Sequence, residues 1–320
     1  MAWETGTAAG HIDLINKIRD FLTTNTDLVN AGENWTQELG PTGALVNGDS
    51  ITLRGPGLTG SENIYCGLQA ISSVGSDIYN IRTWGHPGFS ATLDPRDQAL
   101  KSPDAYVFCW NQTMDYWIVA NGRRWVLIVK VSTVYSSAYC GFFLPYATPS
   151  EYPYPMTVAG ISYANRRWSD QGERNRFMAS PGKGAFWIYY PDNVWRQISN
   201  YEDSDNSPIP EGGSDNQCFG YVFPTRDDTN SPFDSPDAES ITANANTCFD
   251  GSYLLRDLTI VSSDQQSPYS AWMGVLDGVY WIPGRGNSTE NIVDKDGQDH
   301  LVVQNLHRTG FRDYMAVRLS

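Results

Sequence analysis

The hydrophobic pattern is most informative between Tyr116 and Tyr135, where two runs rich in β-branched and aromatic residues meet at Asn121-Gly122. An Asn-Gly pair favours a type I′ turn, whose twist matches that of the flanking strands. The pattern therefore predicts a β-hairpin in which Asp115–Ala120 pairs with Arg123–Val134. A buried helix is the alternative for so apolar a run, but the β-branched residues and the Asn-Gly pair favour strands.

The second arm of this hairpin is apolar on both faces. Alternation places one set of side chains on one face and a second set on the other, namely Trp125, Leu127, Val129 and Val131 against Val126 and Ile128. A strand without polar alternation is usually covered on both sides by other layers of structure. We therefore predict that this hairpin is the central strand pair of a sheet.

The first periodic segment is Gly10–Thr23, in which apolar residues recur at helical spacing. The stripe consists of Leu14, Ile15, Ile18, Phe21 and Leu22. This spacing predicts an amphipathic helix that starts near Thr7 or Gly10 and ends near Asn25. Two roles stay open for it, because the apolar stripe could cover a sheet of its own chain or dock on a neighbouring subunit.

Most of the remaining chain has the composition of short strands separated by turns. Strands or apolar runs are expected at Asp49–Arg54, Ile64–Ser73, Asp77–Thr83, Tyr106–Trp110, Cys140–Pro145 and Phe186–Tyr190, with a loop at His86–Ala105. Two further hairpins are expected near the end of the sequence. One joins Trp272–Leu276 to Val279–Ile282 through a type I′ turn at Asp277-Gly278, and the other joins His300–His307 to Tyr314–Leu319.

The composition agrees with this pattern. The 320 residues include 11 Trp and 18 Tyr, together with 29 Gly and 18 Pro, which suits many short strands with tight turns. The predicted fold is mainly β, with antiparallel sandwich- or barrel-like sheets, one N-terminal amphipathic helix and long loops. Four regions are expected: an N-terminal helical arm (1–30), a β domain with the central hairpin (31–199), an acidic Pro-rich loop (200–240) and C-terminal hairpins packed on the same domain (241–320).

The segment Asn200–Ser240 differs from its surroundings. It carries ten acidic residues and one arginine, and so accounts for nine of the chain's fourteen net negative charges. It is expected to be a long exposed loop with a short strand at Cys218–Phe223, and a loop of this length is either functional or mobile. Its acidic clusters, Glu202–Asp205 and Asp227-Asp228, are candidates for Ca²⁺ binding or glycoside hydrolysis, although they lack the EF-hand spacing and solvation is the more common role of such acids.

Charge and cysteine content exclude several classes of function. A net charge of −14 argues against nucleic acid and against an anionic membrane surface. The five cysteines, Cys66, Cys109, Cys140, Cys218 and Cys248, are odd in number and irregularly spaced, so reduced thiols are expected in place of a disulfide framework or a zinc ribbon. The residues from Met1 to Thr7 lack a signal-peptide pattern, and no stretch has the length of a membrane span. The sequence predicts a soluble protein made in a cytoplasm.

Motif searching predicts no catalytic, cofactor-binding or metal site. The segment Gly55–Gly60 matches G-x-G-x-x-G, but a strand is expected after it where a dinucleotide site needs a helix, so a hairpin loop is favoured. The four histidines, His11, His86, His300 and His307, do not have metal-ligand spacing. A Ser-His-Asp triad assembled from distant residues stays open, because the order of its members in sequence is free.

Several stretches together resemble a family of structural proteins from tailed bacteriophages. They are Glu4–Ala8 followed by Asp13–Leu22, Gly55–Leu58, Trp117–Arg124, Lys130–Tyr135, Gly141–Tyr146, Leu276–Val279, His300–Asn305 and Asp313-Tyr314. The resemblance covers most of the chain in order and departs at about 200–240. It implies a virion protein of the tail or baseplate, assembled in the host cytoplasm, without enzymatic activity or catalytic residues.

The expected partners are copies of this chain and other tail or baseplate proteins, with a host surface glycan as a further candidate. Two segments are expected as contact arms: the N-terminal stretch, where Trp3 precedes the helix, and Asn200–Ser240, whose charge would favour a basic partner surface. The alternative function is a carbohydrate-binding or carbohydrate-cleaving module of the host-adsorption apparatus.

Overall fold

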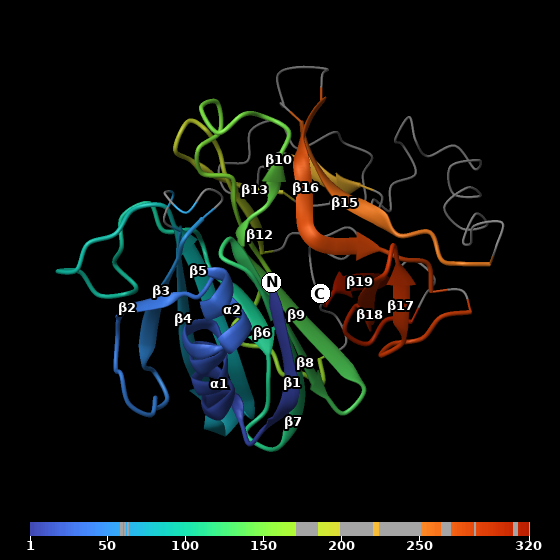
Figure 1. The fold of residues 1–320 in the computed structure, drawn as a ribbon. Helices are drawn as coiled ribbons and strands as arrows, with labels where there is room; N and C mark the ends of the chain where they lie inside the picture. The colour runs from blue at the N-terminus through green and yellow to red at the C-terminus, as the bar shows by residue number, and fades with distance from the viewer. Residues whose placement is uncertain are drawn as a thin grey trace, which may run out of the picture.

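The described residues form three antiparallel sheets (Figure 1). The computed structural model describes residues 1–57, 60, 62, 64–170, 185–198, 220–223, 251–263, 270–284, 286–309 and 313–319. What we call the central sheet has the strand order β1 (Ala2–Ala8), β7 (Met114–Ala120), β8 (Arg124–Val131), β9 (Val134–Phe142), β11 (Met156–Ala159), β12 (Phe186–Tyr189) and β13 (Trp195–Gln197).

The other two sheets pack on the two faces of the central sheet. The outer sheet contains β2 (Thr36–Leu39), β3 (Ser50–Gly55), β4 (Ile64–Ser73), β5 (Ile78–His86) and β6 (Ala105–Phe108) in sequence order, with the 3₁₀ turn η1 (Val74–Ser76) between β4 and β5. The C-terminal sheet has the order β14 (Gly220–Phe223), β15 (Arg256–Ser263), β16 (Ser270–Trp281), β19 (Tyr314–Arg318), β18 (Gln298–Gln304) and β17 (Ile292–Lys295), and β10 (Leu144–Pro145) also pairs with β16. The mainly β, sandwich-like fold is therefore confirmed.

The central position of the predicted hairpin is also confirmed. Strands β7 and β8 pair in the register Ala120 with Trp125, and β8 is covered on both faces. Trp125 belongs to the core between the central and outer sheets, whereas Val126 and Ile128 belong to the core shared with the C-terminal sheet. The double apolar pattern of the second arm thus reflects two separate hydrophobic cores.

The turn of this hairpin differs from the type I′ expectation. Asn121, Gly122 and Arg123 all lack a positive φ. Instead, the Asn121 side-chain oxygen accepts hydrogen bonds from the backbone N–H groups of Arg123 (2.9 Å) and Arg124 (3.0 Å), which fixes a turn centred one residue later. Gly122 is needed for a different reason, because a Cβ there would lie 2.7 Å from Cγ of Pro56.

The second arm also ends earlier than expected. Residues Arg123–Val134 were predicted as one strand, but β8 stops at Val131 and the chain turns through Ser132, whose φ is +57°. Strand β9 then returns beside β8, with Val131 opposite Val134. The turn falls at Ser132-Thr133, a pair that lacks the Gly, Asn or Asp residues of the favoured two-residue hairpin turns.

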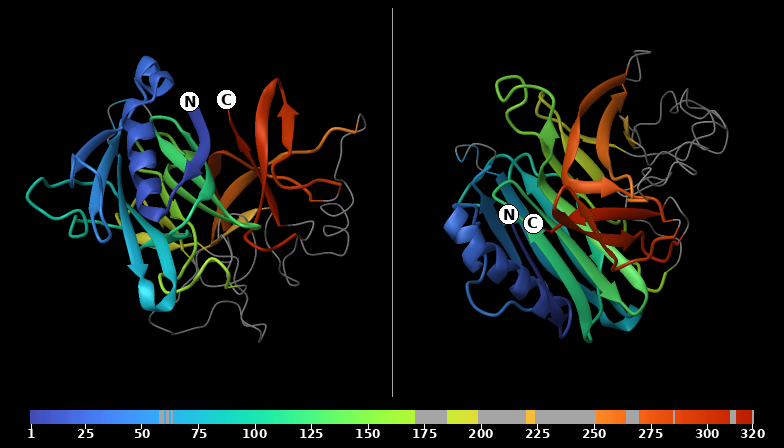
Figure 2. Two further views of the ribbon diagram at one scale, coloured as in Figure 1. Left: turned by 90° about the horizontal axis from the view of Figure 1, so that it is seen from below. Right: turned by 45° about the vertical axis from the view of Figure 1, so that its right-hand side comes forward.

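Helix α1 (His11–Thr24) confirms the amphipathic prediction. All five stripe residues are buried, and α1 packs against β1 of the central sheet and against strands β2, β4 and β5 of the outer sheet (Figures 1 and 2). Asn25 ends α1 and its side chain caps the short helix α2 (Thr26–Ala31). The helix therefore covers sheets of its own chain, and residues 1–30 form an integrated strand and helix in place of the expected arm.

The hairpin expected at Asp277-Gly278 is absent from the described residues, because β16 passes through this point as one bent strand. Of the two residues Asp277 and Gly278, only Gly278 has a positive φ (+69°). The pairing of β15 with β16 shifts in register between Asp257 and Thr259, where β16 bends. The third expected hairpin is confirmed, since β18 pairs with β19 from His300–Arg318 to Gln304–Tyr314. The bend in β16 turns its second half onto β19 (Figure 1).

The remaining strand predictions agree with the structure where it can be compared. Strands β3, β4, β5, β6 and β12 occupy the stretches predicted from alternation, 87–104 form a loop between β5 and β6, and Cys140–Pro145 spans the end of β9 and all of β10. Within 200–240 the described residues are Gly220–Phe223, which form the predicted short strand. No helix among the described residues is long and apolar enough to cross a membrane.

Candidate functional site

A buried ionic cluster joins the central hairpin to the C-terminal sheet. Asp277, at the bend of β16, has only 3% of its side chain exposed, and Arg124, at the start of β8, is fully buried. One carboxylate oxygen of Asp277 accepts hydrogen bonds from Asn121 Nδ2 (2.7 Å) and Arg123 Nη2 (3.1 Å), and Nε of Arg124 lies 3.5 Å from the same oxygen. With Arg318 Nη2 at 3.9 Å from the other oxygen, these five residues form what we call the Asp277 junction.

The electrostatics of the junction keep its carboxylate charged. Burial is the largest single influence and raises the pKa of Asp277, but Arg124, Arg123, Asn121 and Arg318 together outweigh it and hold the pKa below its usual value. The backbone N–H of Asp277 also donates to the Tyr139 hydroxyl (3.3 Å), which donates to the carbonyl of Phe142 (2.6 Å). The bend in β16 is therefore fixed through both the side chain and the backbone of Asp277.

Three glycine-containing segments approach the junction closely. The N–H of Gly57 donates to the carbonyl of Gly122 (2.9 Å), which places the start of the G-x-G-x-x-G segment, just after β3, against the central hairpin. A Cβ on Gly141 would lie 2.3 Å from the carbonyl oxygen of Arg123, and one on Gly278 would lie 2.3 Å from Nη2 of Arg124. Glycine is thus required at positions 141 and 278, because a Cβ atom there would overlap with Arg123 or Arg124.

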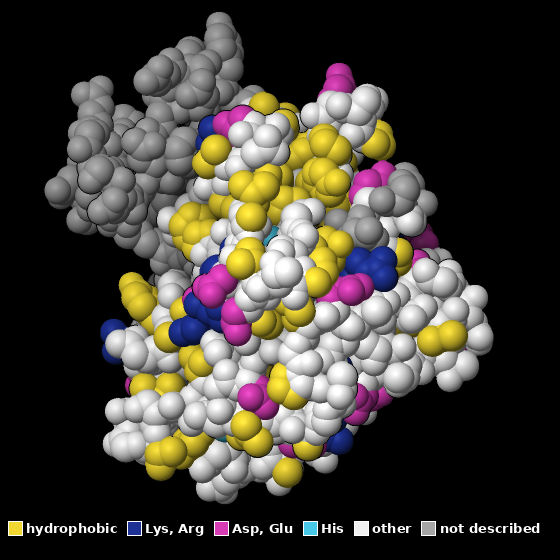
Figure 3. Space-filling model, turned by 90° about the vertical axis from the view of Figure 1, so that its left-hand side faces the viewer, with side chains coloured by type: hydrophobic (Ala, Val, Ile, Leu, Met, Phe, Trp, Pro, Cys, Tyr) yellow, Lys and Arg dark blue, Asp and Glu magenta, His cyan; other side chains and the backbone are white. Residues whose placement is uncertain are grey.

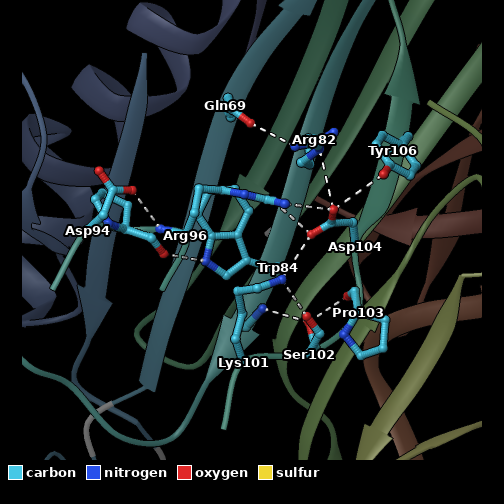
Figure 4. A network of polar contacts seen from close by, with 12 residues as sticks. Gln69, Arg82, Trp84, Asp94, Arg96, Lys101, Ser102, Pro103, Asp104 and Tyr106 are labelled. Atoms are coloured by element: carbon cyan, nitrogen blue, oxygen red, sulfur yellow. Dashed lines mark hydrogen bonds and ion pairs between the residues drawn. The ribbon is translucent and has the colours of Figure 1, made fainter. Parts of the chain in front are cut away.

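A second network fastens the loop 87–104 to the outer face of the outer sheet (Figure 4). Arg96 holds Asp104 with two hydrogen bonds of 2.8 and 3.1 Å, Lys101 Nζ lies 3.2 Å from the same carboxylate, and Arg82 Nε on β5 lies 3.4 Å from it. The guanidinium of Arg96 also stacks over the buried ring of Trp84, 4.8 Å from its centroid. We call this network the Asp104 clasp.

Three cations of the clasp face a single carboxylate, that of Asp104. Burial is the largest influence and raises the pKa of Asp104, yet Arg96 and Lys101 hold it below its usual value, while burial lowers the pKa of Lys101. The arrangement suits attachment of the loop to the sheet.

The histidines are packed into the fold and do not converge. His11, His86 and His300 are each 5% exposed or less, and burial lowers the pKa of all three, to about 4 for His86. Their rings lie against Tyr79, Tyr65 and Tyr280 respectively, in different parts of the protein. Among the residues that the structure describes, no group of three His, Cys, Asp or Glu side chains could hold a metal ion.

The described residues include three of the five cysteines and leave out the acidic clusters of the loop. Cys66, Cys109 and Cys140 are buried and free of disulfides, as expected for core thiols. Cys218, Cys248 and the acidic clusters Glu202–Asp205 and Asp227-Asp228 lie outside the described residues. The proposed roles of those acids in Ca²⁺ binding or in partner contacts therefore stay predictions.

On the face that carries the outer sheet, charged side chains gather in small mixed groups (Figure 3). Lysine and arginine side chains lie beside acidic ones, and hydrophobic side chains are concentrated toward the top of that view. Among the aromatic residues that the structure describes, Tyr146 (62%) and Trp272 (51%) are the most exposed. Their segments are adjacent, because the N–H of Tyr146 donates to the carbonyl of Met273 (2.9 Å).

Sequence reasoning missed both charged networks. Asp277 stood out only as half of a turn signal, and its three arginine neighbours lie in segments far away in the sequence. Three residues of the clasp, Arg96, Lys101 and Asp104, lie in a stretch predicted simply as loop, and Arg82 lies in a predicted strand. A useful signal was available for Arg123-Arg124, since two charged residues interrupt the start of an otherwise apolar strand and need a buried counter-charge.

No protein-family model and no curated protein matches this chain. The functional conclusion therefore depends on the geometry of its own residues and on the resemblance of its sequence motifs.

Proposed function

We propose that this protein is a non-enzymatic structural subunit of a tailed-phage virion, most suited to the tail or baseplate and assembled in the host cytoplasm. The observation that carries the proposal is the convergence of resembling motifs at the Asp277 junction. The motifs Trp117–Arg124 and Leu276–Val279 are far apart in sequence, yet both supply residues of the junction. Gly57 and Gly141, from two further motifs, contact residues 122–124 directly beside it. Motifs that resemble those of a structural family would thus serve here to hold the sheets in a fixed arrangement.

The two charged networks support the same role. The junction ties the C-terminal sheet to the central sheet, and the clasp ties a long loop to the outer sheet. Both clusters place their charged groups in internal contacts, where they fix geometry between elements. A repeated subunit benefits from such rigidity, because small changes of shape would be multiplied over the assembly.

Open sheet edges offer surfaces for neighbouring subunits. Strand β1 is an edge of the central sheet and presents Trp3, which is 43% exposed, while β17 is an edge of the C-terminal sheet and presents Ile292, which is 52% exposed. An edge strand carries backbone donors and acceptors that another chain can pair with. We propose that copies of this chain or other tail proteins bind along such edges.

The decisive experiment is to locate the protein in purified particles. Mass spectrometry of particles freed of host protein should detect the chain at a fixed copy number, and antibody labelling should place it on the tail or baseplate. A matched control is the lysate of infected cells, which shows whether the chain is produced at all. Production in the lysate without incorporation into particles would contradict the proposal.

A second candidate function is binding of a host surface glycan. The exposed aromatic residues Tyr146 and Trp272, which lie on adjacent segments, favour it, since aromatic faces stack on sugars. Purified protein should be screened for binding and for saccharide release with host polysaccharides. Release that disappears when Asp or Glu residues are changed to Asn or Gln would favour this carbohydrate module over the purely structural role.

A further inference from the structure

Two buried cysteines from different sheets lie side by side in the core. Cys66 is on β4 of the outer sheet and Cys140 is on β9 of the central sheet, 74 residues further along the chain. Both side chains are fully buried, and their Sγ atoms are 2.8 Å apart. The S–S bond of a disulfide is about 2.05 Å long, so the two sulfur atoms are within about 1 Å of bonding distance.

The surrounding strands hold the two thiols in this position. Cys66 is paired across β4 and β5 with Gly85, and Cys140 is paired across β8 and β9 with the buried residue Trp125. Both cysteines therefore sit inside regular ladders, where neither backbone is free to move away. Cys109 is a useful contrast, because it is equally buried but its sulfur donates toward a backbone carbonyl, that of Val107, at 3.7 Å.

We propose that Cys66 and Cys140 are a modification site at which a small-molecule disulfide oxidises the two thiols to a bond between the outer and central sheets. The thiolate of one cysteine attacks the reagent R–S–S–R, forms a mixed disulfide and releases one RS⁻. The second cysteine then displaces the other RS⁻, and the two thiol protons end on the released thiols. The protein loses two hydrogen atoms and gains one S–S bond.

Access to the pair sets the rate of this reaction. Burial raises the pKa of the Cys66 thiol, and no reagent reaches a fully buried sulfur without transient opening of the sandwich. Oxidation is therefore slow in the closed protein and accelerates with temperature. Once formed, the bond closes a long loop of chain and restricts the unfolded ensemble, so the oxidised protein melts at a higher temperature.

The test uses the full chain, incubated with the small disulfide cystamine just below its melting temperature. Free thiols are then blocked under denaturing conditions, and a digest made without reduction is mapped by mass spectrometry. The expected product is a Cys66–Cys140 linked peptide, with a melting temperature several degrees higher that returns to its starting value on reduction. The Cys109→Ala variant should behave like the wild type, whereas Cys66→Ala and Cys140→Ala should form no such link.

Two outcomes would overturn the proposal. One is recovery of both Cys66 and Cys140 as blocked thiols after an incubation that modifies a thiol elsewhere in the chain. The other is linkage of either residue to Cys109, Cys218 or Cys248 in the folded protein. If the alanine variants do not fold, the peptide map of the wild type decides by itself.

Discussion

Removing the charge of Asp277 is the sharpest perturbation that the structure offers. The Asp277→Asn variant keeps the size of the side chain and its carbonyl oxygen, but it leaves Arg124 buried without its nearest counter-charge. Arg124 has no exposed surface, and its Nε lies 3.5 Å from the carboxylate. The substitution therefore isolates the electrostatic part of the junction.

The expected cost follows from the burial of both partners. Removing one member of a buried ion pair costs about 3–5 kcal/mol, because the remaining charge is left without compensation in a poorly solvated place. Asp277 also fixes the bend of β16, so the loss should fall at the upper part of this range. The matched control is Asp192→Asn, whose partner Arg196 lies 2.5 Å away but whose own side chain is 51% exposed. An exposed pair of this kind contributes less than about 1 kcal/mol.

The assay is urea denaturation of wild type and both variants at 25 °C, followed by fluorescence of the many tryptophans. At neutral pH the free energy of unfolding of Asp277→Asn should be about 3–5 kcal/mol lower than that of the wild type. The free energy of unfolding of Asp192→Asn should hardly change. The pKa of Asp277 is held below its usual value, so its contribution is complete above about pH 4 and is lost as the pH falls through the folded-state pKa. The difference in the free energy of unfolding between wild type and Asp277→Asn should thus be constant from pH 7 to pH 5 and shrink below about pH 4.

Equal shifts for the two variants at neutral pH would refute the reasoning. So would a difference that grows on acidification, because this would mean that the carboxyl group is neutral in the folded protein. Either result would assign the bend of β16 to packing alone.

Three further measurements test other parts of the structure. Deleting Met1–Thr24 should lower the melting temperature sharply, because β1 and α1 complete the core, and an unchanged melting temperature would restore the idea of an independent arm. Amides of Val126–Val131 should be among the slowest to exchange with D₂O, and fast exchange there would contradict the central position of β8. Gly67→Ala should destabilise by about 1–3 kcal/mol, because its Cβ would lie 1.9 Å from the facing Trp84 ring, whereas Gly75→Ala, with open space around it, serves as control.

The sequence predicted those elements whose pattern is local. Helix α1 follows from one apolar stripe, and β4 was placed at Ile64–Ser73, the same bounds as in the structure, from alternation and flanking turns. The two faces of β8 were assigned correctly because each core needs its own set of apolar residues. Such features depend on a residue's immediate neighbours in the sequence, so they can be predicted from the spacing of apolar residues.

Elements that depend on distant partners were not predictable in this way. Strand β1 has no clear apolar alternation, and it is extended because it pairs with β7. At Asp277-Gly278 a strong turn signal was overridden, because arginines about 150 positions earlier bind the aspartate and keep β16 continuous. The Asp104 clasp and the thiol pair likewise join residues whose only relation is in space. A single sequence does not encode such proximity in any local pattern.

The pairing of β1 has a consequence for folding during synthesis. Ala2 lies opposite Ala120, so the partner of the first strand is encoded 118 positions later. At a typical elongation rate of about 5–20 residues per second, this strand waits roughly 6–24 s on the ribosome before its partner exists. During that interval its backbone donors and acceptors are unpaired, and when many ribosomes translate one message the waiting strands of neighbouring chains are close together. Exchange of β1 between nascent chains is thus a natural route to a swapped dimer.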